Sequence, residues 1–137
     1  MLSLIIRFRP FAGYILAMTV ILIMVVSSIP SLPTLKIHTA RSDIRLDYFI
    51  HFCEYGFLAF IAFLTSTGSD FTTPFKKFIL VASGLFLFAV IDEYHQKFIP
   101  GRTFNPKDLI SNISGIVIAM IFSIVVFRKI AERKTNK

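Results

Sequence analysis

The sequence lacks most of what a small soluble domain carries on its surface. Only 17% of its 137 residues are charged, whereas 55% are apolar, and the mean hydropathy is +0.71. Soluble domains carry roughly 25% charged residues, so the composition excludes that class. The single cysteine, Cys53, also excludes an internal disulfide and a cysteine-based metal site within one chain.

Motifs of common soluble enzymes are missing as well. The sequence has no HExxH zinc motif, no nucleophile elbow, no P-loop and no dinucleotide-binding fingerprint. The net charge of +7 is compatible with nucleic-acid binding. However, the basic residues flank apolar runs, which is typical of membrane proteins. We therefore expect the lipid bilayer as a partner, no nucleic acid and no cofactor.

Four apolar runs fill most of the chain, and a membrane-spanning helix needs about 20 such residues. The polar stretch from Thr34 to Asp47 is expected to be a loop. The first run is longer than the apolar part of a usual signal peptide, so we expect it to be retained. The expected fold class is all-α, a polytopic membrane protein with a bundle of four transmembrane helices. It forms one domain over 1–137, with helices at about 11–29, 48–65, 77–97 and 108–127 and a basic cytoplasmic tail at 128–137.

The distribution of positive charge predicts the orientation of these helices. Nine Lys and Arg residues lie in the N-terminal segment, the middle loop and the C-terminal tail, and six lie in the other two loops. Cytoplasmic segments carry the excess of positive charge in membrane proteins. We therefore expect a multi-pass protein of the bacterial inner (cytoplasmic) membrane, with both termini in the cytoplasm.

On three of the four expected helices, ionisable and polar residues lie at one end. The expected orientation places that end in the outer leaflet. Their spacing puts the members on each helix mainly on one face. A lone carboxylate at the depth of Glu54 would cost several kcal/mol in lipid, so we expect these residues to share an interior pocket. The set comprises Asp47, His51, Glu54 and Tyr55 of the second helix, Asp92, Glu93 and Gln96 of the third, Arg102 of the following turn, and Asp108 and Asn112 of the fourth.

Each of these residues also has a purely structural interpretation. Asp92 and Arg102 could form an ordinary interfacial ion pair, and His51 could be a hydrogen-bonded interior histidine. Several members offer donor atoms for a metal ion, but their spacing matches no known metal motif, so no metal is expected. The cost of burying charge in lipid favours a functional role for the set as a whole.

Three segments of the sequence resemble the VanZ-like family. They are Asp47–Gly56 (DYFIHFCEYG), Asp92–Arg102 (DEYHQKFIPGR) and Asp108–Gly115 (DLISNISG). Ser27, Ser28 and Pro30 also resemble the family pattern, so the similarity extends from the first helix to the fourth. The resemblance implies a small polytopic protein of the cell envelope, in a family whose founding member is associated with low-level teicoplanin resistance. It places functional weight on the polar set except Asp47, and also on Pro100, Gly101 and Gly115.

The first functional hypothesis is a binding protein of the cell envelope. Arg102 would hold an anionic head group, because guanidinium suits phosphate and carboxylate. The carboxylates of Asp92, Glu93 and Asp108 would contact sugar hydroxyls, amines or a cation. The ligand would be a lipid-linked cell-wall precursor, a phospholipid or a lipoglycopeptide, and binding would modulate susceptibility to glycopeptides such as teicoplanin.

Two alternatives remain open at this point. In the first, the protein is an intramembrane hydrolase or transferase that acts on a lipid-linked phosphate. His51 or Glu54 would be the general base, and Asp92 and Glu93 would hold a divalent cation at the phosphate. In the second, Glu54 and His51 form the proton relay of a transporter. The oligomeric state is not predicted.

Overall fold

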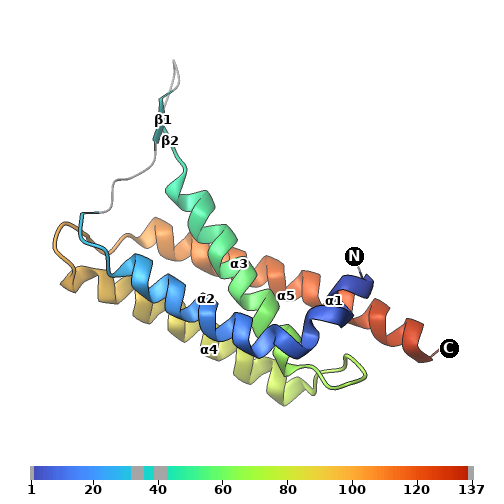
Figure 1. Cartoon of the computed structure of the whole chain (residues 1–137). Helices are drawn as coiled ribbons and strands as arrows, with labels where there is room; N and C mark the ends of the chain where they lie inside the picture. The colour runs from blue at the N-terminus through green and yellow to red at the C-terminus, as the bar shows by residue number, and fades with distance from the viewer. Residues whose placement is uncertain (1, 32–35, 39–42, 136–137) are drawn as a thin grey trace.

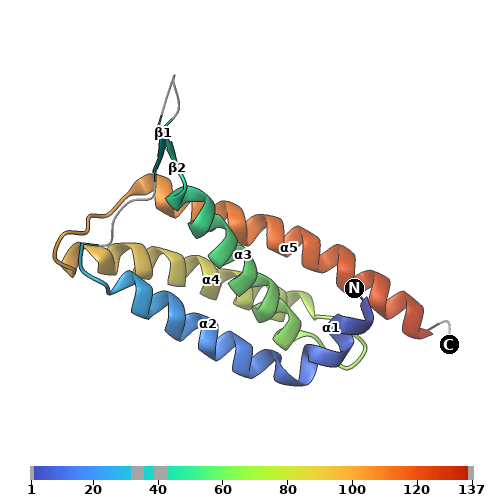
Figure 2. The same cartoon turned by 45° about the horizontal axis from the view of Figure 1, so that its top comes forward.

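The computed structural model describes residues 2–31, 36–38 and 43–135. It is built of long helices that run in a similar direction, except that the helix Asp47–Ser66 is inclined to the others (Figures 1 and 2). The helical fold class is therefore confirmed. A short helix α1 and a 3-10 turn η1 precede the first long helix, and a second 3-10 turn η2 follows the third. The helical elements are α1 (Leu2–Phe8), η1 (Arg9–Phe11), α2 (Ala12–Ser27), α3 (Asp47–Ser66), α4 (Phe75–His95), η2 (Gln96–Phe98) and α5 (Pro106–Thr135).

The expected loop between the first two long helices contains a small antiparallel ribbon. Strand β1 (Lys36–His38) pairs with strand β2 (Asp43–Arg45), with Ile37 opposite Ile44. Figure 1 shows this ribbon projecting away from the bundle, next to the start of α3. It contains six residues only, so the all-α class holds.

Among the described residues, three helical segments are long and apolar enough to cross a membrane: Ser3–Ser27, Asp47–Ser66 and Pro106–Thr135. Helix α4 is not among them. It carries Lys76 and Lys77 near its first residue and Asp92 and Glu93 near its last, and such charges lower the hydropathy of a span. That α4 also crosses the membrane stays a prediction. Helix α5 continues to Thr135, so most of the expected basic tail is helical.

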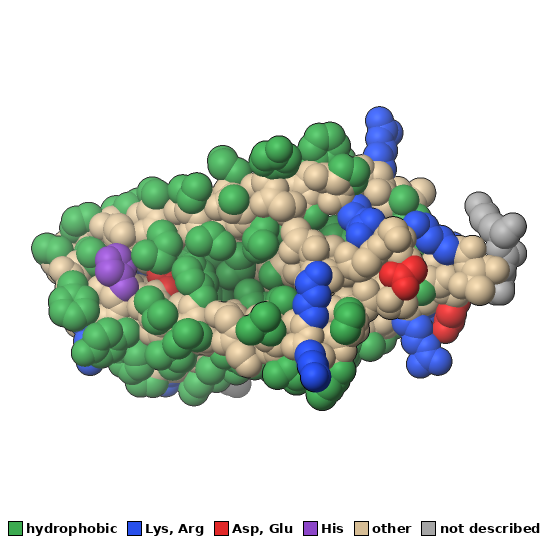
Figure 3. All heavy atoms as spheres, turned by 90° about the horizontal axis from the view of Figure 1, so that it is seen from below, with side chains coloured by type: hydrophobic (Ala, Val, Ile, Leu, Met, Phe, Trp, Pro, Cys, Tyr) green, Lys and Arg blue, Asp and Glu red, His purple; other side chains and the backbone are tan. Residues whose placement is uncertain are grey.

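The outer surface of the bundle is apolar, whereas several of its buried side chains are polar. Tyr14, Met18, Leu80 and Phe75 are all more than two-thirds exposed. Figure 3 shows hydrophobic side chains covering most of one face. A soluble protein rarely exposes so large an apolar area. This surface suits contact with lipid acyl chains, so the chain is a membrane protein.

Helices α3 and α5 share the most extensive contact in the bundle. A Cβ atom at Gly115 would collide with the carbonyl oxygen of Phe52 and lie 3.0 Å from the backbone nitrogen of Gly56. Small residues allow helix backbones to approach closely in membranes. Gly115 therefore serves packing, and it holds the start of α5 against α3 beside Asn112.

Candidate functional site

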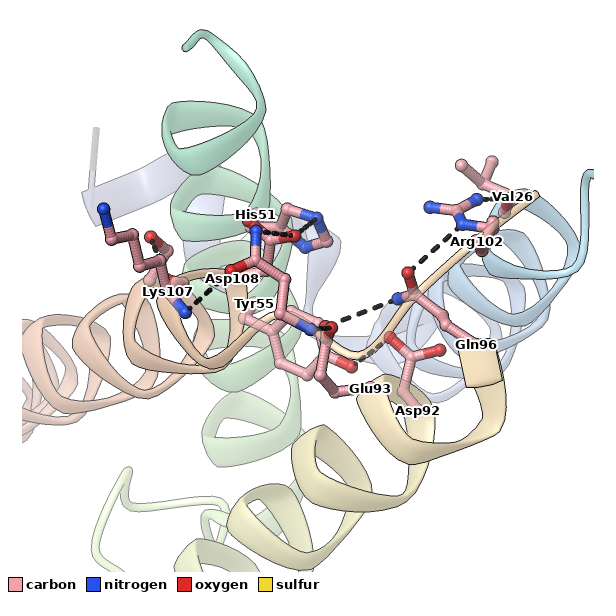
Figure 4. A network of polar contacts seen from close by, with 11 residues as sticks. Val26, His51, Tyr55, Asp92, Glu93, Gln96, Arg102, Lys107 and Asp108 are labelled. Carbon is pink, nitrogen blue, oxygen red and sulfur yellow. Dashed lines mark hydrogen bonds and ion pairs between the residues drawn. The ribbon is translucent and has the colours of Figure 1, made fainter. Parts of the chain in front are cut away.

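Most of the predicted site residues meet at one end of the bundle, where α3 and α5 begin and α4 ends (Figure 4). We call this group the polar cluster. Tyr55, Asp92, Glu93, Gln96, Asp108 and Asn112 are all buried in it, and His51 is half-buried. Its members are His51, Glu54, Tyr55, Asp92, Glu93, Gln96, Arg102, Asn105, Asp108 and Asn112.

Helices α3 and α4 are joined by a buried hydrogen bond. The Tyr55 hydroxyl donates to Oδ2 of Asp92 over 2.7 Å, and both side chains are at most 1% exposed. A hydrogen bond to a charged group is shorter and stronger than one between neutral groups. Tyr55 therefore fixes the position of the Asp92 carboxylate in the interior.

Asn105 connects the end of α4 to the start of α5. Its backbone N–H donates to Oε1 of Glu93 over 2.8 Å, and its side-chain amide donates to Oδ2 of Asp108 over 2.9 Å. Its side-chain oxygen accepts a hydrogen bond from the backbone N–H of Lys107, which is the contact of a helix N-cap. An asparagine before a proline is a typical helix start, but nothing in the sequence indicates that Asn105 would join two carboxylates.

The remaining members on α3 lie beside the carboxylates. Nε2 of His51 is 3.9 Å from Oδ2 of Asp108. Glu54 is half-buried and lies within electrostatic range of His51, Asp92 and Arg102. Asp47 is half-buried at the first residue of α3, one helical turn before His51.

Arg102 contacts the end of α2. Its Nε donates to Oε1 of Gln96 over 3.2 Å, and its Nη1 donates to the carbonyl oxygen of Val26 over 2.9 Å. The carbonyl oxygen of Ile29 lies 3.5 Å from the same Nη1. A cation at a helix C-terminus satisfies carbonyl groups and complements the helix dipole. The guanidinium therefore joins α2 to the polar cluster, in addition to any role in binding a ligand.

The turn that carries Arg102 is shaped by Gly101, which has a φ of +76°. A Cβ atom there would collide with Ser31, whose backbone N–H donates to the carbonyl oxygen of Pro100 over 3.0 Å. Left-handed backbone conformations favour glycine. The Pro100–Arg102 turn and the segment after α2, which both carry the family resemblance, are thus in direct contact.

Several buried polar atoms of the polar cluster have no hydrogen-bond partner among the described residues. They come from three helices: Nδ1 of His51, Oδ1 of Asp92, Oδ1 of Asp108, and both Nδ2 and Oδ1 of Asn112. Asn112 is fully buried. Leaving a buried polar group unpaired costs about 1–3 kcal/mol. These atoms therefore lack the partners that hydroxyl, amino or carbonyl groups of a ligand would supply.

The polar cluster holds more acidic than basic side chains. It contains four carboxylates, from Glu54, Asp92, Glu93 and Asp108, and two groups that can be positive, Arg102 and His51. Buried charges of one sign are costly unless they are paired or protonated. The arrangement favours a ligand that donates hydrogen bonds or carries a positive group. No set of three or more His, Cys, Asp or Glu side chains that could hold a metal ion was found in the described ranges.

Sequence comparison identifies the family of the chain. The VanZ/LLP1 family profile matches residues 4–128, a range that contains every member of the polar cluster. No curated protein and no solved structure gave a significant match. The family recognised from three short segments is the one that the profile finds over nearly the whole length, so the protein belongs to the VanZ/LLP1 family of membrane proteins.

Proposed function

We propose that the protein binds the head group of an amphiphilic cell-envelope ligand in the polar cluster. The ligand is an anionic lipid-linked cell-wall precursor or a lipoglycopeptide, and its apolar tail lies along the lipid-facing helices. The unpaired polar atoms of His51, Asp92, Asp108 and Asn112 carry this proposal. Native proteins pair nearly all buried polar groups, so a group of unpaired atoms needs an explanation, and a missing ligand supplies one.

The chemistry of the polar cluster narrows the class of ligand. Its surplus of carboxylates suits a head group rich in hydroxyl or amino donors, such as an amino sugar or a peptide amine. Arg102 is the cation that could meet a phosphate or carboxylate of the same head group. Nε and Nη1 already contact Gln96 and Val26. An anion would therefore be bound mainly by the remaining guanidinium nitrogen, Nη2.

Binding at the outer leaflet would explain a role in glycopeptide susceptibility. A protein that binds the cell-wall precursor, or the acylated antibiotic itself, lowers the amount of that molecule that is free at the membrane surface. Less antibiotic then binds to the precursor. In this proposal both termini lie in the cytoplasm and the polar cluster lies at the outer surface of the inner membrane. The positive-charge distribution in the sequence supports that orientation.

The sharpest test replaces Asn112 by leucine. Its amide is fully buried without a partner among the described residues, so Asn112→Leu should leave the protein as stable as before or more so. If the amide contacts a ligand, the same variant should weaken the binding of teicoplanin, or of a polyprenyl-linked muropeptide, by roughly tenfold or more. Binding would be measured by microscale thermophoresis on protein in nanodiscs.

Two further variants complete this test. Asp70→Asn changes an exposed acid in the loop before α4 and should leave the affinity unchanged. Arg102→Ala should weaken binding and also loosen the end of α2, whereas Arg102→Lys should restore only part of both. Unchanged affinity of Asn112→Leu and Arg102→Ala for both probes would contradict the proposal.

The enzymatic alternative has one observation in its favour, the proximity of His51 to Asp108. A histidine oriented by a carboxylate is a common general base. If this pair acts on a lipid-linked phosphate, the purified protein should release phosphate from a polyprenyl pyrophosphate when Mg²⁺ is present. Glu54→Gln or His51→Gln should then abolish release while binding persists. Absence of release by the unaltered protein would leave the binding proposal alone.

A further inference from the structure

A second polar feature lies at the opposite end of the bundle from the polar cluster. A pocket of about 340 Å³ opens between η1, the end of α3 and the end of α5, and its lining includes Arg9, Phe71 and Lys134 with the apolar Ile6 and Leu64. Figure 1 shows the described N-terminal segment and the end of α5 close to this end. Figure 3 shows most of the Lys and Arg side chains of that face gathered there.

The two cations of the pocket are held by the loop between α3 and α4. Nη2 of Arg9 donates to the carbonyl oxygen of Thr67 over 2.8 Å, and Nζ of Lys134 donates to that of Ser69 over 2.9 Å. Both also lie over the same ring: the Arg9 guanidinium is 5.2 Å and the Lys134 ammonium 5.1 Å from the centroid of Phe71. Residues from the two ends of the chain are thus brought to one site.

Phe71 adopts an unfavourable backbone conformation to occupy this place. Its φ is +62°, a left-handed conformation that costs an L-residue roughly 1–2 kcal/mol. The turn is closed by hydrogen bonds from Phe71 N–H to the Gly68 carbonyl and from Gly68 N–H to the Thr72 carbonyl. The ring is nevertheless 3% exposed. Strain of this kind tends to persist where the placed side chain has a role.

The positive charges of the pocket have no direct acidic partner among the residues that the structure describes. Within the described ranges, neither Arg9 nor Lys134 forms an ion pair with a carboxylate. Asp70, the acid in this loop, is bound elsewhere: hydrogen bonds from the Thr72 hydroxyl and then the Thr72 N–H lower the pKa of its carboxyl group, and Arg9 contributes least. Glu132 pairs with Arg128 instead.

We infer that this pocket binds the phosphate of an anionic phospholipid and so connects η1 to the end of α5. Arginine and lysine are the side chains that hold phosphate, arginine through two parallel hydrogen bonds. The apolar Ile6 and Leu64 beside them, at one end of helices that cross the membrane, suit the glycerol and first methylene groups of a lipid. Soluble phosphate offers the same anionic group without these apolar contacts.

The experiment measures how much phosphatidylglycerol the protein retains in detergent, by native mass spectrometry. Each of Arg9→Gln and Lys134→Gln should lower lipid affinity roughly fivefold, because one basic residue near an anionic lipid surface contributes about 1 kcal/mol. Arg9→Lys keeps the charge and should keep most of the affinity. If Arg9→Lys keeps the affinity, the loss in Arg9→Gln follows from the missing charge and not from substitution at position 9 as such.

Three controls make the outcome decisive. Lys76→Gln removes an exposed charge at the start of α4, outside the pocket, and should change the affinity less than twofold. An equal loss in Lys76→Gln would overturn the inference in favour of a diffuse basic surface. Equal retention of phosphatidylcholine would overturn it as well. Inorganic phosphate that displaces the lipid at an equal phosphate concentration would overturn the lipid assignment and leave a site for free phosphate.

Discussion

The two ends of the bundle handle charge in opposite ways. At the polar cluster, side chains from α3, α4 and α5 are buried and bonded to one another, as in the contact of Tyr55 with Asp92. At the other end, Arg9 and Lys134 rest on loop carbonyl groups and on the surface of one aromatic ring. Burial makes each group of the polar cluster depend on its neighbours. Lys134 is exposed and Arg9 is half-buried, so water and salt screen their charges more.

This difference predicts where substitutions will be costly. Removing one partner of a buried polar contact leaves the other partner buried without a hydrogen bond. Removing an exposed charge leaves its former partner free to bind water. The polar cluster should therefore be sensitive to the loss of any side chain that is hydrogen-bonded within it or that holds its helices together. Asn112, whose amide has no partner among the described residues, is the exception. The end of the bundle that carries Arg9 and Lys134, which we call the basic end, should tolerate single substitutions in the absence of its ligand.

The largest effect is expected for Gly115→Ala, which acts on the packing that supports the polar cluster. The new methyl group would meet the backbone carbonyl of Phe52, and backbone cannot move aside as a flexible side chain can. Because overpacking of this kind is destabilising, we expect the free energy of unfolding to fall by about 3 kcal/mol. Unfolding in mixed detergent and SDS micelles, followed by circular dichroism, measures it.

Two other glycines provide matched controls for this substitution. A Cβ atom at Gly56 would lie 3.5 Å from the Gly115 carbonyl oxygen, which is an ordinary contact, and one at Gly84 would meet nothing within 4 Å. Since alanine also favours helix, both variants should stay within about 1 kcal/mol of the unaltered protein. Equal destabilisation by all three would show that α3 and α5 are not in close contact.

The next largest effect is expected for Tyr55→Phe, which removes a single oxygen from the polar cluster. Asp92 would then lose the hydrogen bond to its Oδ2, and its Oδ1 already has no partner among the described residues. We expect a loss of about 1.5 kcal/mol in the free energy of unfolding. Tyr94→Phe, which changes a tyrosine that is 52% exposed, should have almost no effect. A loss as small in Tyr55→Phe would contradict the buried contact.

These contacts also show how far the sequence alone could lead. Apolar runs and the positions of Asp92, Glu93 and Asp108 within them were enough to predict a helical bundle with carboxylates at the ends of its helices. The partners of those carboxylates depend on the path of the segment between η2 and α5. No periodic pattern predicts that path, so neither the role of Asn105 nor the contact of Arg102 with Val26 could be foreseen.

The basic end was even less visible in the sequence. Arg9 and Lys134 are 125 positions apart, and positive charge near an apolar run signals orientation rather than a site. Phe71 lies in a stretch rich in Ser, Thr, Gly and Asp that predicts a loop and nothing more. Its left-handed backbone, which turns the ring under both cations, is unusual for a residue other than glycine and is set by tertiary contacts.

The smallest effect is expected for Glu132→Gln at the basic end. Nε of Arg128 lies 3.1 Å from Oε1 of Glu132, but the two side chains are 79% and 59% exposed. Exposed pairs four residues apart on a helix contribute less than about 0.5 kcal/mol and are screened by salt. The free energy of unfolding should thus change by less than that amount, and less still in 0.5 M salt. Only a desolvated ion pair loses much free energy of unfolding when one partner is neutralised. A loss as large as that expected for Tyr55→Phe would therefore mean that the charges at both ends of the bundle depend equally on their partners.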